Sequence, residues 1–128
     1  MSYYINRTLR LPFDEAVSRT VQALKSEGFG IISEIDVSAT LKEKAGIDYP
    51  AYRILGACNP AMAHKALVLE DKVGTMLPCN VIVRDAGNGA TEVAAVDPLA
   101  SMQAIANPAL TDLARAVRAR LQAAVQHL

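Results

Sequence analysis

The sequence has little that would assign the protein to a class by composition. It contains 13 basic and 13 acidic residues and has no net charge, so it lacks the positive field that binding to nucleic acid or anionic lipid requires. No apolar run reaches the roughly 18 to 20 residues of a membrane span, and the first ten residues lack the apolar core of a secretion signal. We therefore expect a cytoplasmic protein that binds neither nucleic acid nor membrane.

Motifs that identify a reaction are also missing. The sequence has no Ser-His-Asp arrangement, no glycine-rich phosphate loop and no group of metal ligands at a recognised spacing. Two cysteines are too few for a framework of disulfides, and a reducing compartment keeps them as thiols. The two cysteines therefore act, if they act at all, by reactivity, by ligation or by packing.

What is present suits one folded domain over residues 1–128. Apolar residues make up 52% of the chain and charged residues 20%, which is enough apolar surface for a core and argues against disorder. A chain of 128 residues has the usual size of a single domain and buries roughly two thirds of its unfolded surface. No linker or low-complexity tract divides it.

The spacing of the apolar residues predicts both strands and helices. Strands are expected at 3–9, 30–37, 49–57, 76–85 and 91–96, the last two joined by a tight turn at 87–89. Helices are expected at 12–27, 38–45, 60–70 and 108–127, with a short helix after Asp97. The order β-α-β-β-(α)-β-β-α predicts an α+β domain of two layers.

Helix starts are the clearest local signals. Asn59, Asp97 and Asn107 each precede a proline, and this pair favours a helix start because the first side chain caps free amides while proline suits the first helical position. Ser38 is expected to cap the exposed helix 38–45, and Gly46 to end it. The last helix has an apolar stripe that we expect to lie on the sheet, formed by Leu110, Leu113, Ala114, Val117, Leu121, Ala124 and Val125.

The unusual residues lie together in the segment from Tyr49 to Val83. It holds Cys58 and Cys79, each followed by an asparagine and each with a proline nearby. Cys58 comes just before a helix start, where free amides and the helix dipole favour a reactive or metal-binding thiolate. The alternative is that each cysteine packs as a small apolar residue. Nothing in the sequence places a helix dipole behind Cys79.

Whether the two thiols act together depends on the topology. If the third and fourth strands ran parallel, the thiols would lie at opposite ends of the sheet. If the strands are antiparallel, Cys79 returns towards Cys58, and a site for a soft metal or another thiophilic ligand becomes feasible. Asn59 and Asn80 would supply amide groups to that site, and His64 an imidazole. As caps, turn residues and a solvated helix face, these three residues also have structural explanations.

The blocks YRILGACNP (52–60) and GTMLPCNVIV (74–83) closely resemble an uncharacterised bacterial and archaeal family, domain of unknown function 302. The hairpin after them and the closing helix NPALTDLARAVRARL also resemble it, so the resemblance covers most of the chain. It implies a fold similar to that of the TATA-binding protein, β-α-β(4)-α, with an antiparallel sheet, helices on one face and frequent homodimers. The order predicted above fits this fold if helix 60–70 is an insertion between the third and fourth strands. The resemblance implies no activity, and it favours the antiparallel alternative.

Three functions remain open at this point. The first is a small cytoplasmic ligand-binding or sensor module that binds a soft metal or thiophilic ligand through Cys58 and Cys79, with Asn59, Asn80 and His64 as further candidate ligand contacts. The second is an enzyme in which Cys58 is the nucleophile. The third is a structural dimerisation domain with packed cysteines. We expect a homodimer, because a small antiparallel sheet leaves edges to cover, and the sequence assigns no cofactor.

Overall fold

A five-stranded antiparallel sheet is the centre of the computed structural model, which describes residues 2–128. The strands follow the order β1-β5-β4-β3-β2 across the sheet, and every neighbouring pair is antiparallel. Their bounds are Tyr4–Leu9 for β1, Gly30–Asp36 for β2, Tyr52–Cys58 for β3, Cys79–Gly87 for β4 and Ala90–Val96 for β5. The antiparallel pairing of β3 with β4 decides the topological question that the sequence left open.

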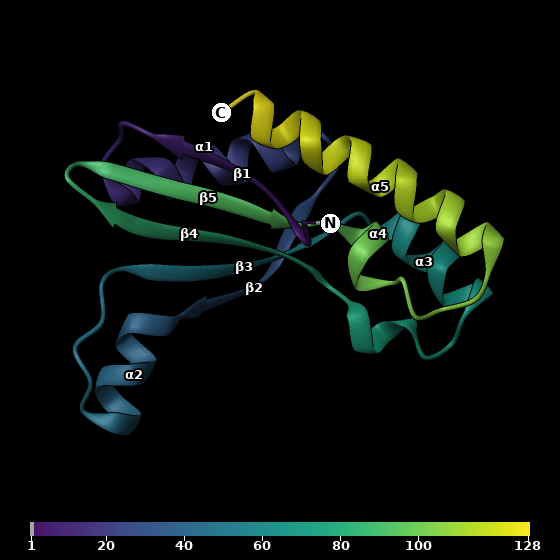
Figure 1. Ribbon diagram of the computed structural model, residues 1–128, viewed down its shortest axis with the longest axis horizontal. Coiled ribbons are helices and arrows are strands. Elements are labelled where there is room, and N and C mark those ends of the chain that lie inside the picture. Colours follow the sequence, from purple (N-terminus) through teal and green to yellow (C-terminus); the bar gives the residue numbers. More distant parts are fainter. Residues whose placement is uncertain (1) are drawn as a thin grey trace.

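Helices cover one face of this sheet. Their bounds are Phe13–Ser26 for α1, Val37–Ala45 for α2, Pro60–Leu69 for α3, Pro98–Ser101 for α4 and Pro108–Gln126 for α5, with a 3₁₀ helix η1 at Val73–Met76. Helices α1 and α5 pack on the sheet and against each other, whereas α2 extends away from them beyond β2 (Figure 1). The prediction of a two-layer α+β domain with an antiparallel sheet is confirmed.

The predicted elements are present, with shifted bounds. The third strand begins at Tyr52, later than expected. The fourth begins at Cys79, because Val73–Met76 forms the helix η1 and the next strand starts only after Pro78. The cap of α2 was assigned wrongly to Ser38: Asp36 accepts the hydrogen bond from the backbone N–H of Ala39 at 2.9 Å. As expected, α2 is largely exposed, with no buried residue, and Gly46 ends it.

Strand alternation separates the sheet into a covered face and an open face. On the covered face, β3, β4 and β5 place Leu55, Val81 and Val93 against α1 and α5, and these side chains are fully buried. We call the region where these side chains meet α1 and the C-terminal half of α5 the packed end. On the open face, Ile35, Ile54 and Ile82 lie side by side on β2, β3 and β4.

Helix α5 does two different things along its length. Its C-terminal half packs on the sheet through Leu121, Ala124 and Val125, as the apolar stripe predicts. The same prediction is wrong for its N-terminal half, because Leu110 and Leu113 pack with residues of α3, η1 and the segment after α4 instead. Figure 1 shows this half running past the end of the sheet, above α3 and α4.

Candidate ligand-binding site

Three capped helix starts position the walls of a site at that end of the molecule. Asn59 accepts a hydrogen bond from the backbone N–H of Met62 at 3.2 Å and begins α3. Asp97 caps α4 and Asn107 caps α5 in the same way. Each cap is followed by a proline, so the three helices begin where the sequence predicts.

Between these helices and the end of the sheet lies a partly open cavity of about 350 Å³. Its walls come from the ends of β3 and β4, from α3, from the segment around η1, from the end of α4 and from the N-terminal half of α5. The lining residues are Phe29, Ile32, Ala57, Cys58, Asn59, Met62, Ala63, Ala66, Leu67, Gly74, Leu77, Pro78, Cys79, Met102, Leu110, Leu113, Ala114 and Val117. Most of these side chains are aliphatic or are methionines.

Both cysteines belong to this wall, but they do not form a pair. The register aligns Cys79 with Ala57, one residue before Cys58. Because successive side chains of a strand point to opposite faces, this offset directs the two cysteine side chains to opposite faces of the sheet. Cys79 is buried with Ala57 in the core, Cys58 is half-buried, and both are free thiols. The antiparallel strands therefore return Cys79 to the same region without bringing the thiols together.

The thiol of Cys79 is held in its neutral form. Burial, and secondarily the charge that Cys58 can carry, raises the pKa of Cys79 to about 11. A thiol with this pKa is protonated at neutral pH, and the thiolate is the form that attacks electrophiles and binds metals. Within residues 2–128, moreover, no three His, Cys, Asp or Glu side chains are grouped so that they could hold a metal ion.

The remaining candidate residues lie outside the cavity. His64 is on the exposed side of α3. Asn80 is exposed on the open face of the sheet, one position beyond Cys79. Of the five side chains that the sequence singled out, the structure thus brings Cys58, Asn59 and Cys79 to one cavity and leaves His64 and Asn80 away from it.

Most of the wall was not foreseen from the sequence. The lining side chains of α3 and α5, such as Met62, Ala63 and Leu113, look like ordinary core residues when read singly. The sequence did contain one signal, since α3 reads PAMAHKALVL and has almost no polar face. In the structure, only Ala66 of this helix is buried, and Leu67, Val68 and Leu69 are exposed. A short apolar helix that is this exposed indicates a surface with a function beyond packing.

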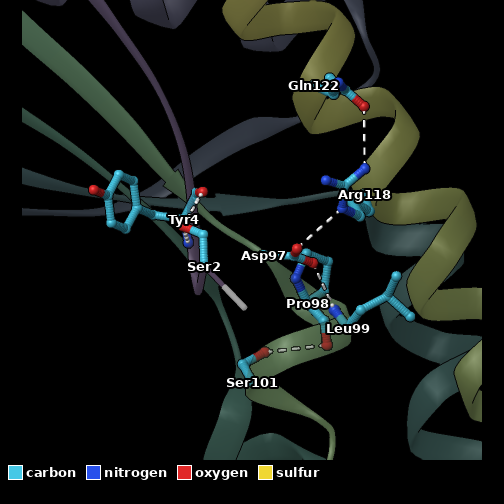
Figure 2. A network of polar contacts seen from close by, with 8 residues as sticks. All are labelled: Ser2, Tyr4, Asp97, Pro98, Leu99, Ser101, Arg118 and Gln122. Carbon is cyan, nitrogen blue, oxygen red and sulfur yellow. Dashed lines mark hydrogen bonds and ion pairs between the residues drawn. The ribbon is translucent and has the colours of Figure 1, made fainter.

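A partly buried ion pair fixes α5 beside the cavity. Asp97 is 7% exposed and accepts hydrogen bonds from the backbone N–H of Leu99 and from Arg118 Nε, each at 3.0 Å. Arg118 Nη1 donates in turn to Gln122 Oε1 at 3.1 Å, as Figure 2 shows. This chain of contacts joins the end of β5, the start of α4 and the middle of α5. These contacts therefore hold the N-terminal half of α5 in place over the cavity.

Gly56 allows two segments to approach the end of β3 closely. A Cβ at this position would collide with Ser33 Oγ and would lie 2.8 Å from Pro78 Cγ. The close approach of Pro78, which borders the cavity, thus requires glycine at position 56. Gly56 and Pro78, one from each of the two sequence blocks described above, thus lie against each other in the fold.

Among the helices of residues 2–128, none is sufficiently long and apolar to cross a bilayer.

Comparisons with other proteins agree with this fold and name no activity. Residues 5–128 match the model of the family described as domain of unknown function DUF302. A crystal structure of an uncharacterized conserved protein DUF302 from Bacillus stearothermophilus is similar, with 30% sequence identity, a TM-score of 0.91 and 98% of each chain covered. No curated protein matches the chain.

Proposed function

The chain belongs to the DUF302 family, whose description names no activity, and from the cavity we propose that the protein binds a small molecule between α3, α5 and the ends of β3 and β4. The observation that supports the proposal is a cavity of about 350 Å³ with an apolar wall. This volume falls within the range of small-molecule sites, roughly 300 to 1,000 Å³. An apolar cavity without an occupant lowers the stability of a fold, so its presence favours a ligand.

The wall is well suited to hold a ligand because its parts are fixed independently of one another. Arg118 and Asp97 anchor α5, the Asn59 cap positions α3, and the Nδ2 atom of Asn107 donates a hydrogen bond to the Leu69 carbonyl at 3.2 Å. Ala66 is the one buried residue of α3, so these polar contacts contribute much of what holds α3 in the wall.

In this proposal the cysteines contribute wall surface and no metal ligation. Cys79, with its neutral thiol, and the half-buried Cys58 both border the cavity, alongside Met62 and Met102. Such groups suit a polarisable or thiophilic molecule. The module predicted from the sequence is retained, with the soft metal replaced by a small organic ligand.

A cavity-filling substitution tests the proposal. The neutral fluorophore 1-aminonaphthalene is titrated into the purified protein, into Ala63→Phe and into Ala61→Phe, and its fluorescence is followed. Ala63 lines the cavity, whereas Ala61 is exposed on the same helix. We expect Ala63→Phe to abolish binding of the probe and Ala61→Phe to preserve it. Circular dichroism checks that both variants fold, and Ala63→Leu replaces Ala63→Phe if that variant does not.

If Ala63→Phe and Ala61→Phe bind the probe equally well, the probe binds elsewhere on the protein and the proposal is refuted.

We also propose that the protein forms a homodimer through the open face of the sheet. This face carries the apolar row Ile35, Ile54 and Ile82, and its central charges neutralise each other because Arg84 Nε lies 2.6 Å from Glu92 Oε1. A neutral apolar face is complementary to a second copy of itself. Five strands about 4.8 Å apart and about 20 Å long give roughly 1,000 Å² for two copies, near the lower limit of a specific interface.

Light scattering coupled to size-exclusion chromatography tests the dimer with a matched pair of variants. Ile35 on the open face and Ile47 after α2 are both 49% exposed, so the same substitution to lysine perturbs each monomer similarly. We expect Ile35→Lys to elute as a monomer, and the unmodified protein and Ile47→Lys as dimers. A monomeric unmodified protein would exclude this interface.

A further inference from the structure

We propose that the ligand of the cavity is an uncharged, predominantly apolar molecule of about twelve non-hydrogen atoms. This number follows from the cavity volume of about 350 Å³ when each non-hydrogen atom is given about 30 Å³, the volume of one water molecule in the liquid. This inference rests on the proposed function, because it concerns the same cavity. It narrows that function to a chemical class, namely neutral molecules such as medium-chain esters, ketones and alcohols, and it excludes the carboxylates and amines of the same length.

The composition of the wall is the first argument. Within the described residues, 2–128, the side chains that border the cavity include no lysine, arginine, histidine, aspartate or glutamate. Its polar side chains are the two cysteines and Asn59, and the Oδ1 atom of Asn59 already accepts a hydrogen bond from Met62. A ligand charge taken into this cavity would lose its water and gain no opposite charge, which strongly disfavours ionic ligands.

The surroundings of the cavity are the second argument. Arg118 and Arg120, which follow the lining part of α5, are engaged by Asp97 and by the Glu27 carbonyl respectively. The charged side chains next to the lining residues, Lys65 on α3 and Asp112 and Arg115 on α5, are exposed and of both signs. A ligand with an ionic head at the rim would therefore find no dominant charge to pair with.

A group in the wall agrees with the same preference. The Cys79 thiol borders the cavity, and burial raises its pKa to about 11. The environment of the wall thus disfavours a negative charge on a group that is already there. The same environment would act on a ligand carboxylate placed beside it.

A set of probes with equal size and different charge tests the proposal. Methyl nonanoate, 1-undecanol, decanoate and undecylammonium each have twelve non-hydrogen atoms, and at neutral pH the first two are uncharged, the third is an anion and the fourth a cation. Each of the four is titrated against 1-aminonaphthalene bound to the unmodified protein, with Ala63→Phe as the control for displacement of the probe from other places. We expect the ester and the alcohol to displace the probe at concentrations at least tenfold lower than the two ions.

The outcomes separate this proposal from the one on which it rests. If decanoate or undecylammonium displaces the probe as well as the neutral compounds do, the ligand class is wrong while the binding function stands. If 1-aminonaphthalene binds but none of the four compounds displaces it, the class and size proposed here are both wrong. If Ala63→Phe binds the probe like the unmodified protein, the cavity is not the site and both proposals fail.

Discussion

The two ends of helix α5 stand in different surroundings, although both carry the same kind of apolar stripe. At the packed end, Leu121 is fully buried against the sheet and α1, in a region where side chains fill the space. Towards the N-terminus of the helix, Leu113 and Val117 are half-buried and border the cavity. One helix therefore contributes stability at one end and a binding wall at the other.

The difference shows that apolar pattern and packing are separate properties. Leu113 and Leu121 occupy the same stripe, so periodicity treats them alike. Only the position of the sheet distinguishes them. The C-terminal half of α5 lies over the sheet, whereas its N-terminal half extends past the ends of β3 and β4 (Figure 1). The four predictions below test this contrast, from the largest expected effect to the smallest.

Truncation of Leu121 should be far more costly than truncation of Leu113. We expect Leu121→Ala to lower the free energy of unfolding by about 2 to 5 kcal/mol, because it opens a void in a filled core. Leu113→Ala removes a side chain that already faces a cavity, so we expect a loss of roughly 1 kcal/mol. Urea denaturation of both variants measures the difference. Equal losses would mean that the two ends are packed alike.

Cys79 should make stability depend on pH in the alkaline range. Its pKa is raised from an ordinary value of 9.0 to about 11, so the unfolded chain loses this proton at lower pH than the folded protein does. The contribution is therefore complete below pH 9 and is lost as the pH rises towards 11. It amounts to about 2 to 3 kcal/mol for two pKa units. Denaturation of the unmodified protein and of Cys79→Ala across this range should differ in slope, and parallel curves would contradict the prediction.

Gly56→Ala should destabilise the junction between the sheet and the cavity. The added Cβ meets Ser33 Oγ and Pro78 Cγ, and we expect a loss of about 1 to 3 kcal/mol from this overpacking. A second substitution, Ser33→Ala, removes the hydroxyl from the collision. The double variant should therefore recover part of the loss, whereas Ser33→Ala alone should have little effect. No recovery in the double variant would show that the strain lies elsewhere.

Asn107→Asp should loosen α3 with little effect on global stability. Aspartate keeps the oxygen that caps α5 but lacks the amide that donates to the Leu69 carbonyl at 3.2 Å. We expect faster hydrogen exchange in α3 and unchanged exchange at the packed end. Asn107→Ala, which also removes the cap, should cost about 1 kcal/mol in addition. Unaltered exchange of α3 in both variants would mean that this bond does not hold it.

Local signals were sufficient for much of the fold. The caps at Asn59, Asp97 and Asn107 act on amides within three residues, and the Asn88-Gly89 turn needs only the positive φ angles that these two residues adopt. Such interactions are complete within a few residues of chain. For that reason the sequence by itself determined the starts of α3, α4 and α5, the hairpin and the two-layer α+β class.

The candidate site depended on contacts between distant residues. The pairing of Ala57 with Cys79 sets the register that separates the two thiols, and the close approach of Pro78 to Gly56 depends on the same strand pair. The cavity exists because α5 extends past the end of the sheet. The ion pair that holds α5 there joins Arg118 to Asp97, which are 21 positions apart in the chain. Residue spacing carries no information on these distances. Only the tertiary structure decided where the sheet stops, which is why the cysteines were found from the sequence and the cavity was not.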